Sequence, residues 1–251
     1  MAAGETEMPI NEAKGNMYPW VTHTHAELGG ECEHKCRYCY VNNPRWGRAP
    51  RYCGAVRLIE KETKTRLGSG RVIFKEHMND LFAASVPADL VQMVLVHCQQ
   101  WPDNTYVFQS KNPARFQFFN FPDSPLIFGT TIETNRDIAE SISVAPSPFE
   151  RMLAMSASNI QNVDKFVTIE PVMDFDVDVL ASWIDKIRPR FLNLGADSKN
   201  HNLPEPTVDK VFALAEKLNE YGIELREKHN LSRLTKRAPS LAQEARRDDE
   251  E

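Results

Sequence analysis

Short apolar strand patterns alternate with helix patterns along most of this chain, and this alternation limits the possible folds more than any other feature. Strands are predicted over residues 18–28, 71–76, 104–113, 124–133, 164–172 and 190–198, with a short seventh over 223–229. Helices are predicted over 87–102, 146–161, 177–189 and 207–222. Strands that alternate with helices pair in parallel within βαβ units. The strand cores VIF, LIF and FVTI are apolar on both faces, as buried parallel strands are.

The alternation therefore predicts an α/β fold, best described as a complete or partial TIM-type barrel. An open doubly wound sheet is the alternative. No G-x-G-x-x-G motif follows a strand and no G-x-x-x-x-G-K-[ST] motif occurs, so a nucleotide-phosphate fold has no direct support. We expect the barrel over residues 18–229, after a flexible arm at 1–17 and before a charged, frayed tail at 230–251.

Composition supports a folded protein of 251 residues with a sizeable core, since 41% of the residues are hydrophobic and 26% are charged. The net charge of −5 gives no support for broad non-specific binding of nucleic acid. No apolar run approaches about 18 residues, and the acidic, polar start of the chain does not resemble a signal peptide. These features predict a cytoplasmic protein with no membrane segment, in which thiols stay reduced.

Three of the five cysteines fall within the stretch ECEHKCRYCYV at 31–41, in a polar loop predicted over 29–51. One interpretation is structural zinc, with His34 or Cys53 as a fourth ligand, although the spacing is unlike a zinc knuckle. A thioredoxin-like CRYC pair is a second, but it leaves Cys32 without a role. Buried structural cysteines are a third, and they fit poorly because the neighbouring residues are mostly charged.

An iron–sulfur cluster fits this spacing better. Cys32, Cys36 and Cys39 can supply three thiolates to a [4Fe-4S] cube. Three ligands leave one iron open, and an open metal position can bind a small molecule directly. Cys98, within an apolar helix pattern, is expected in the core, and Cys53 is expected to be a spare thiol.

The C-x3-C-x2-C pattern, with an aromatic residue before its third cysteine and a strand before the loop, resembles the signature of radical S-adenosylmethionine (SAM) enzymes. Further segments resemble the phage Gp37/Gp68-type radical SAM family across most of residues 18–229. They are NDLFAASVP (79–87), FQSKNPARF (108–116), GTTIETN (129–135), SPFERM (147–152), TIEPVMDFD (168–176) and NLGADSKNHNLPEP (193–206). The cysteine loop is also similar to that of spore photoproduct lyase, a DNA-repairing member of the superfamily.

The resemblance implies a partial (β/α)6 barrel, with a [4Fe-4S] cluster held by Cys32, Cys36 and Cys39 and with SAM bound at its open iron. It also implies an electron donor such as flavodoxin or ferredoxin, and a 5′-deoxyadenosyl radical that removes a hydrogen from the substrate. Tyr38 matches the aromatic residue near the adenine. The superfamily's Gly-Gly-Glu after the second strand is absent here, and we expect Asn79 or Asp80 to take part of its role.

Polar residues recur at the predicted C-terminal ends of the strands, where barrel enzymes place their sites. The candidates for binding the cofactor are Ser110, Lys111, Thr131, Glu133, Asn135, Glu170 and Gly195. Lys111 is expected to bind the carboxylate of SAM, Glu133 its ribose, and Gly195 is expected to admit the adenine. Each side chain could equally form an ion pair or a cap.

Candidates for contact with the substrate are Asp197, Ser198, His23, His25, Arg45 and Trp46. Arginines beside an aromatic residue can bind phosphates and stack on a base, which together with the resemblance predicts a nucleobase, free or in DNA, as the substrate. A small-molecule substrate is an open alternative, because the chain is acidic. The alternative from another class of protein is a zinc-binding interaction protein without catalytic activity.

Overall fold

The computed structural model describes residues 10–42, 50–157 and 163–235, which fall into two compact units. The first unit consists of Met1–Glu33, Val41–Phe108 and Phe118–Ile127. The second consists of His34–Tyr40, Gln109–Gln117 and Phe128–Glu251. The expected limits of one barrel domain, 18 and 229, stay a prediction.

The first unit is built on the strands β1 (Asn11–Glu12), β2 (His23–His25), β5 (Val72–Lys75) and β6 (Thr105–Gln109), which follow one another in that order. β2, β5 and β6 are parallel, whereas β1 is antiparallel to β2. β1 lies within the segment 1–17 that was predicted to be a flexible arm, and the extent of that arm stays a prediction. The backbone N–H of Ala13 donates to Thr22 O at 2.9 Å, and Ile10 is buried, so this segment is fixed to β2.

A small hairpin of β3 (Leu28–Gly29) and β4 (Arg57–Leu58) brings the chain to the start of the cysteine loop. Gly30 has φ +94°, and a Cβ atom there would lie 2.4 Å from the carbonyl oxygen of Ala55. The glycine is needed because the backbone of its own chain passes across it. Helices α1 (Glu60–Thr63) and α2 (Ala88–Gln99) complete this unit, and Cys98 on α2 is fully buried, as expected.

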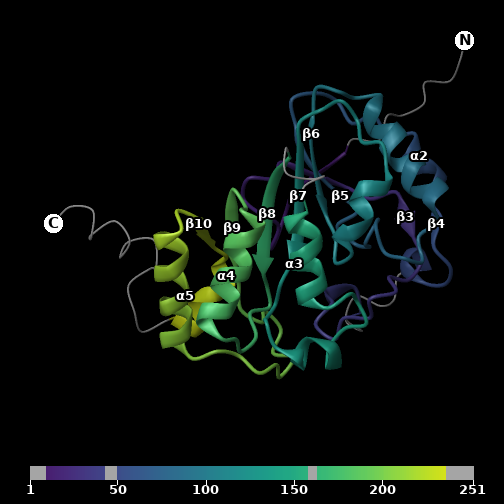
Figure 1. Ribbon diagram of the computed structural model, residues 1–251. Helices are drawn as coiled ribbons and strands as arrows, with labels where there is room; N and C mark the ends of the chain where they lie inside the picture. Colours follow the sequence, from purple (N-terminus) through teal and green to yellow (C-terminus); the bar gives the residue numbers. More distant parts are fainter. Residues whose placement is uncertain (1–9, 43–49, 158–162, 236–251) are drawn as a thin grey trace, which may run out of the picture. The chain divides into compact units, whose positions relative to one another are not determined.

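The second unit is built on β7 (Leu126–Thr131), β8 (Asp164–Ile169), β9 (Phe191–Leu194) and β10 (Glu224–Glu227), in that order. β8, β9 and β10 are parallel. Helices α3 (Pro148–Ser156), α4 (Val177–Ile187) and α5 (Val208–Glu220) connect them, and α4 packs against both α3 and α5 (Figure 1). The predicted α/β fold with mainly parallel strands is confirmed.

Alternate residues of β8 and β9 point to opposite faces, because a strand has a period of two. One set consists of fully buried apolar side chains: Val167, Ile169, Leu192 and Leu194. The opposite set begins with Phe166 and Phe191, whose rings stack with centroids 5.6 Å apart, and it becomes polar towards the C-terminal ends of the strands. Polar side chains on this face therefore gather at one end of the strands.

The end of the described chain is ordered, contrary to the expectation of a frayed tail from 230. A 3₁₀ turn (His229–Leu231) leads into α6 (Ser232–Thr235), and Leu231 is fully buried. The part of the tail beyond 235 lies outside the described residues. Among the described residues, no helix has the length and apolar character that a membrane crossing needs.

Candidate functional site

The second unit carries a cluster of charged side chains directly beyond the C-terminal ends of its strands. Glu133 follows β7, Glu170 follows β8, and Lys228 follows β10. Lys111 lies in the segment Gln109–Gln117 of the same unit. Successive parallel strands end at the same edge of a sheet, so side chains at these positions can meet. The contacts described below show which of them do.

Glu133 is the centre of one buried group of side chains. Its Oε1 atom accepts hydrogen bonds from the Tyr38 hydroxyl and from Lys111 Nζ. Its Oε2 atom accepts from Arg151 Nη1 at 2.9 Å. Lys111 Nζ also donates to the Tyr38 hydroxyl oxygen at 2.6 Å. The carboxylate is 2% exposed and the Arg151 side chain 1%, so this is a desolvated ion pair and not a surface contact.

Charges around Glu133 decide its protonation state. Burial by itself would raise the pKa of this carboxyl group, but Arg151 and Lys111 outweigh burial and lower the pKa to about 2. Burial and the Glu133 carboxylate both raise the pKa of the Tyr38 phenol well above its usual value. At neutral pH, Tyr38 is therefore a protonated donor and Glu133 an ionised acceptor.

The cysteine loop is tied to the segment that follows β7. Arg37 N donates to Ile142 O at 2.9 Å, and Val144 N donates to His34 O at 3.0 Å. Cys36 Sγ lies 3.2 Å from Ser143 Oγ, which in turn donates to His34 O at 3.0 Å.

All five cysteines lie among the described residues, and none of them forms a disulfide there. Cys36 is buried, while Cys32 and Cys39 are half-buried. Cys32 belongs to the first unit, and Cys36 and Cys39 belong to the second. Three thiols outside any disulfide, within eight consecutive residues, are a donor set that suits a metal cluster.

Glu170 is also engaged by neighbouring side chains. Lys228 Nζ lies 2.6 Å from its Oε2 atom, and Asn230 Nδ2 donates to its Oε1 atom at 2.6 Å. A Cβ atom on Gly195 would lie 2.9 Å from Glu170 Oε1 and from Asn230 Oδ1. Gly195 therefore allows these two side chains to lie close against the backbone of the strand end, and its predicted contact with the adenine of SAM stays a prediction.

Asp197 organises the loop after β9. Its carboxylate accepts from the backbone N–H of Lys199 at 3.1 Å and lies 2.6 Å from His201 Nδ1. Ser198 is exposed. Asn135 pairs with Asp176 through two hydrogen bonds, at 3.2 Å and 2.8 Å. These contacts give Asp197 and Asn135 local structural roles, and a role towards a ligand stays a prediction for all three predicted residues.

Ser110 and Thr131 are buried within the same unit. Ser110 Oγ accepts from Asn112 N at 2.8 Å, which turns the chain after β6. Thr131 Oγ1 accepts from Gln109 Nε2 at 2.9 Å, and Thr131 O accepts from Arg151. Their predicted contacts with a cofactor stay predictions.

In the first unit, Asn79 and Asp80 form the turn after β5. Asn79 Nδ2 donates to Gly30 O at 3.3 Å, so it holds the backbone just before the cysteine loop. Asp80 Oδ1 accepts from Phe82 N at 3.0 Å, which is a turn-forming contact. His23 Nδ1 lies 2.8 Å from Thr22 Oγ1. Their predicted contacts with SAM or substrate stay predictions.

The predicted substrate residue His25 belongs to a buried ionic cluster in the first unit. Lys75 Nζ lies 2.9 Å from His25 Nδ1 and 2.8 Å from Glu27 Oε2, and the Lys75 and Glu27 side chains are 0% exposed. His97 Nδ1 contacts Glu27 Oε1, and His97 Nε2 lies 2.8 Å from Thr65 O. Ligand atoms of the two histidines and Glu27 lie within 4.8 Å of one another. The Lys75 ammonium, however, already supplies the cation that this cluster requires.

Glu76 joins this cluster to the strand that precedes the cysteine loop. Its carboxylate accepts from the backbone N–H groups of Glu27 at 2.6 Å and Leu28 at 3.1 Å. Burial and the neighbouring Glu27 charge raise its pKa to about 7. Glu76 has φ +56°, a conformation that non-glycine residues seldom adopt, and its two hydrogen bonds help to maintain it.

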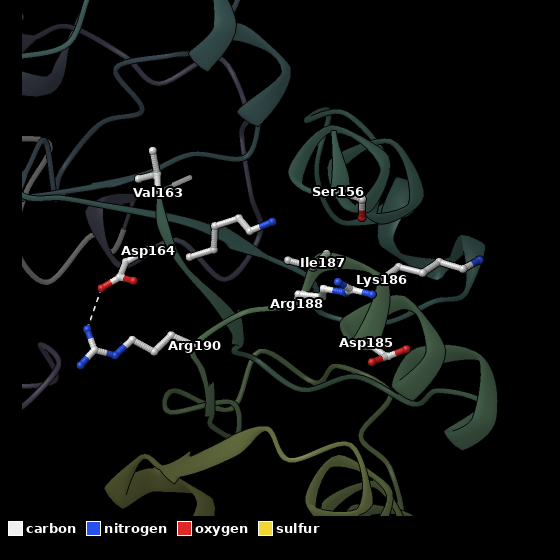
Figure 2. A pocket seen from close by; sticks show the side chains of 9 residues that line it. Ser156, Val163, Asp164, Asp185, Lys186, Ile187, Arg188 and Arg190 are labelled. Atoms are coloured by element: carbon white, nitrogen blue, oxygen red, sulfur yellow. Dashed lines mark hydrogen bonds and ion pairs between the residues drawn. The ribbon is translucent and has the colours of Figure 1, made fainter. Parts of the chain in front are cut away.

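A cavity of about 740 Å³ lies at the opposite, N-terminal end of β8 and β9 (Figure 2). Its Arg190 pairs with Asp164 at 2.6 Å, and its buried Lys165 donates to Met155 O at 3.0 Å, at the C-terminal end of α3. Cations there balance the partial negative charge of helix C-termini. Because barrel sites lie at the C-terminal ends of strands, we place the candidate site at the Glu133 end.

Three residues near the strand ends were not predicted from the sequence: Arg151, Lys228 and Asn230. Lys228 directly follows a strand, so the reasoning used for the other strand ends could have found it. Arg151 lies in the first turn of α3, which begins with a capping box formed by Ser147 and Glu150. No sequence pattern indicates that its guanidinium points to β7. Arg45 and Trp46, predicted to contact the substrate, lie outside the described residues.

Comparison with known proteins identifies the fold. No protein-family model matches the chain, and no curated protein matches it. Among solved structures, a mutant of spore photoproduct lyase matches with a TM-score of 0.61 and 8% identity, covering 85% of this chain and 78% of that one. The fold is that of a radical SAM partial barrel.

A second structure of spore photoproduct lyase, with bound AdoMet and dinucleoside spore photoproduct, matches with a TM-score of 0.53 and 11% identity. That match covers 82% of this chain and 63% of the lyase chain, so the present chain spans less than two thirds of the length of that relative. The expected α/β partial barrel is thereby confirmed. The resemblance to the phage Gp37/Gp68-type family stays a prediction.

Proposed function

We propose that this chain is a radical SAM enzyme whose [4Fe-4S] cluster is held by Cys32, Cys36 and Cys39. The observation that carries the proposal is the C-x3-C-x2-C spacing of three thiols, none in a disulfide, on a chain with the radical SAM fold. When bound, such a cluster would supply the one electron needed for reductive cleavage of SAM, the chemistry that radical SAM enzymes use to abstract hydrogen from a substrate. The protein orients both molecules and excludes water from them.

The residues at the strand ends are proposed to bind SAM. Lys111 is the candidate for its carboxylate, because the ammonium lies in the Glu133 group beside the cysteine loop residue Tyr38. Glu133, the candidate for the ribose, already accepts hydrogen bonds through both oxygens, so a ribose hydroxyl would have to share or replace one of them. The other residues predicted to contact SAM are proposed here as further contacts with it: Tyr38, Asn79, Asp80, Ser110, Thr131, Asn135, Glu170 and Gly195.

A nucleobase or nucleotide is the proposed substrate class. The similar lyase structure contains a dinucleoside, and the cysteine loop resembles that of the same enzyme. The net charge of −5 instead favours a small substrate, or one presented by a partner protein. The proposed reaction is a modification of nucleic acid in a phage context. The proposed electron donor is a protein such as flavodoxin or ferredoxin.

Anaerobic purification and reconstitution test the proposal. Wild-type protein should be brown, bind about four irons per chain, and form 5′-deoxyadenosine from SAM when a reductant is added. Cys36→Ala should lose the bound iron and the formation of 5′-deoxyadenosine. Cys53→Ala, at a half-buried cysteine outside the motif, should keep the iron and the activity and is the matched control.

Three results would refute the proposal. A Cys36→Ala variant that forms 5′-deoxyadenosine at the wild-type rate would refute the assigned mechanism. Wild-type protein that takes up no iron in an oxygen-free preparation would do the same. A colourless protein that keeps one zinc ion through reconstitution would favour the zinc-binding interaction protein.

A further inference from the structure

The Tyr38 hydroxyl links the cysteine loop to the end of strand β7. Tyr38 lies between the predicted cluster ligands Cys36 and Cys39, and its hydroxyl donates to Glu133 and accepts from Lys111 at 2.6 Å. The Lys111 ammonium also lies over the Tyr38 ring, 5.2 Å from its centroid. The Tyr38 side chain has little conformational freedom, because its ring contacts Lys111 and its hydroxyl both donates and accepts a hydrogen bond.

The ring of Tyr38 packs against a small apolar cluster, which is formed by Ala139, Ile142, Met173 and Leu203. The hydroxyl therefore projects from an apolar site into the charged Glu133 group. Apolar contact places the ring, and the hydrogen bonds select its orientation.

Arg151 fixes Glu133 in the direction that receives this hydroxyl. Its guanidinium donates to Glu133 Oε2 at 2.9 Å, to the carbonyl oxygen of Thr131, and through Nε to Pro146 O at 2.8 Å. Three acceptors on two segments leave the planar guanidinium little rotational freedom. The N-terminal capping box of α3 holds the first turn of the helix on which Arg151 lies.

A buried ion pair of this kind contributes little net stability, because removing both charges from water costs about as much as their attraction returns. Apolar residues of the same size would serve stability equally well. The arrangement is better explained by orientation, since an ionised carboxylate held on one side by Arg151 presents its other oxygen in a fixed direction.

We propose that Glu133 and Arg151 are positioning residues that act through Tyr38 to hold the Cys36–Cys39 segment in the conformation needed to bind the cluster. This inference rests on the proposed function and goes beyond it, because it assigns Glu133 to the cysteine loop and adds Arg151, which contacts neither SAM nor cluster in the proposal. Groups that orient metal ligands from outside usually change metal affinity about 10- to 100-fold when they are removed.

Tyr38→Phe tests the inference most directly, since it removes one hydroxyl while leaving the ring and the Glu133–Arg151 pair in place. The reconstituted variant should release iron to a chelator about 10- to 100-fold faster than wild type. The change in the electron paramagnetic resonance signal on adding SAM should also differ from that of wild type. Tyr106→Phe is the matched control, because this buried hydroxyl donates to Cys98 O at 3.0 Å in the first unit.

A double-mutant cycle tests whether Arg151 acts through Tyr38. If it does, Arg151→Met combined with Tyr38→Phe should release iron no faster than the more severe single variant. Circular dichroism and the unfolding midpoint of each apoprotein show whether it is folded. If Arg151→Met fails to fold, Tyr38→Phe alone decides the inference.

The outcomes separate this inference from the proposed function. If wild type binds the cluster and Tyr38→Phe retains iron as well as wild type does, with an unchanged spectrum, the positioning role is refuted and the enzyme proposal stands. If Tyr106→Phe releases iron as fast as Tyr38→Phe does, the effect is general destabilisation and the inference also fails. If wild type itself binds no cluster, both proposals fail.

Discussion

Replacing Lys75 by Met tests whether the buried cluster of the first unit is held together by charge. The Lys75 ammonium lies 2.8 Å from Glu27 Oε2, and neither side chain is exposed. Methionine has a similar length and no charge, so the packing volume changes little. The substitution leaves Glu27 in contact with His97 and near His25, without the Lys75 ammonium.

The loss of unfolding free energy in Lys75→Met should increase as the pH rises. Burial by itself would raise the pKa of Glu27, but Lys75 and the neighbouring histidines outweigh burial and lower the pKa below the ordinary 4.5. In wild type, this group therefore stabilises the fold above about pH 4.5, and the contribution is lost as the pH falls through the lowered pKa. In Lys75→Met, burial dominates and the carboxyl group takes up a proton on folding.

Holding that proton costs about 1.4 kcal/mol for each pH unit above the ordinary pKa. The free energy of unfolding should therefore fall by about 3–5 kcal/mol near pH 8, which is also the usual cost of breaking a buried ion pair. Near pH 5 the electrostatic part of the loss should shrink to less than about 1 kcal/mol.

Urea unfolding of wild type and Lys75→Met at these two pH values measures the effect. Arg190→Met is the matched control, because its pair with Asp164 is 64% and 50% exposed and should contribute less than about 1 kcal/mol at either pH. A loss in Lys75→Met that is equal at both pH values, or no larger than in the control, would show that the buried charge does not set the stability of this cluster.

Three further predictions concern buried carboxyl groups and a glycine. Glu76 has a pKa raised to about 7, so its contribution to the free energy of unfolding is complete below about pH 4.5 and is lost as the pH rises through 7. Urea unfolding of wild type should show a decline of roughly 3 kcal/mol over this range, and Glu76→Gln should flatten it. Glu133→Gln should lower the free energy of unfolding by about 3–5 kcal/mol at neutral pH, because the buried charge of Arg151 loses its carboxylate partner. Wild type loses this stabilisation as acidification approaches the Glu133 pKa of about 2, and the variant should lack that loss. An acid transition that is the same in both proteins would contradict this. Gly30→Ala should unfold at clearly lower urea than Gly54→Ala, because both have positive φ but only the Cβ at Gly30 would lie 2.4 Å from Ala55 O.

Sequence periodicity located the longer elements well. The strand predicted at 164–172 is β8 (Asp164–Ile169), and the helix predicted at 177–189 is α4 (Val177–Ile187). These patterns are local, since they depend on which face of a segment is apolar. The two-residue strands β1 and β3 have no such pattern, and only pairing with segments distant in sequence makes them strands.

Polar residues at the strand ends were predicted from the sequence, but the side chains that they contact were not. Glu133 was predicted to contact a ribose, whereas its nearest groups are Tyr38, Lys111 and Arg151. Tyr38 is 95 residues away from Glu133 in the sequence. Charge pairing over such separations depends on which strand neighbours which, and no single-segment pattern contains that information.

The proposed role of the cysteines as cluster ligands rests on the sequence, because the C-x3-C-x2-C spacing allows a folded loop to bring three thiols together. What holds that loop was decided by the tertiary structure. Ser143 beside Cys36, and Glu133 beside Tyr38, become neighbours only when the segment after β7 packs against the loop. The sequence spacing of the three cysteines is fixed by covalent connectivity, whereas the orientation of the loop is fixed by non-covalent contacts that form only on folding.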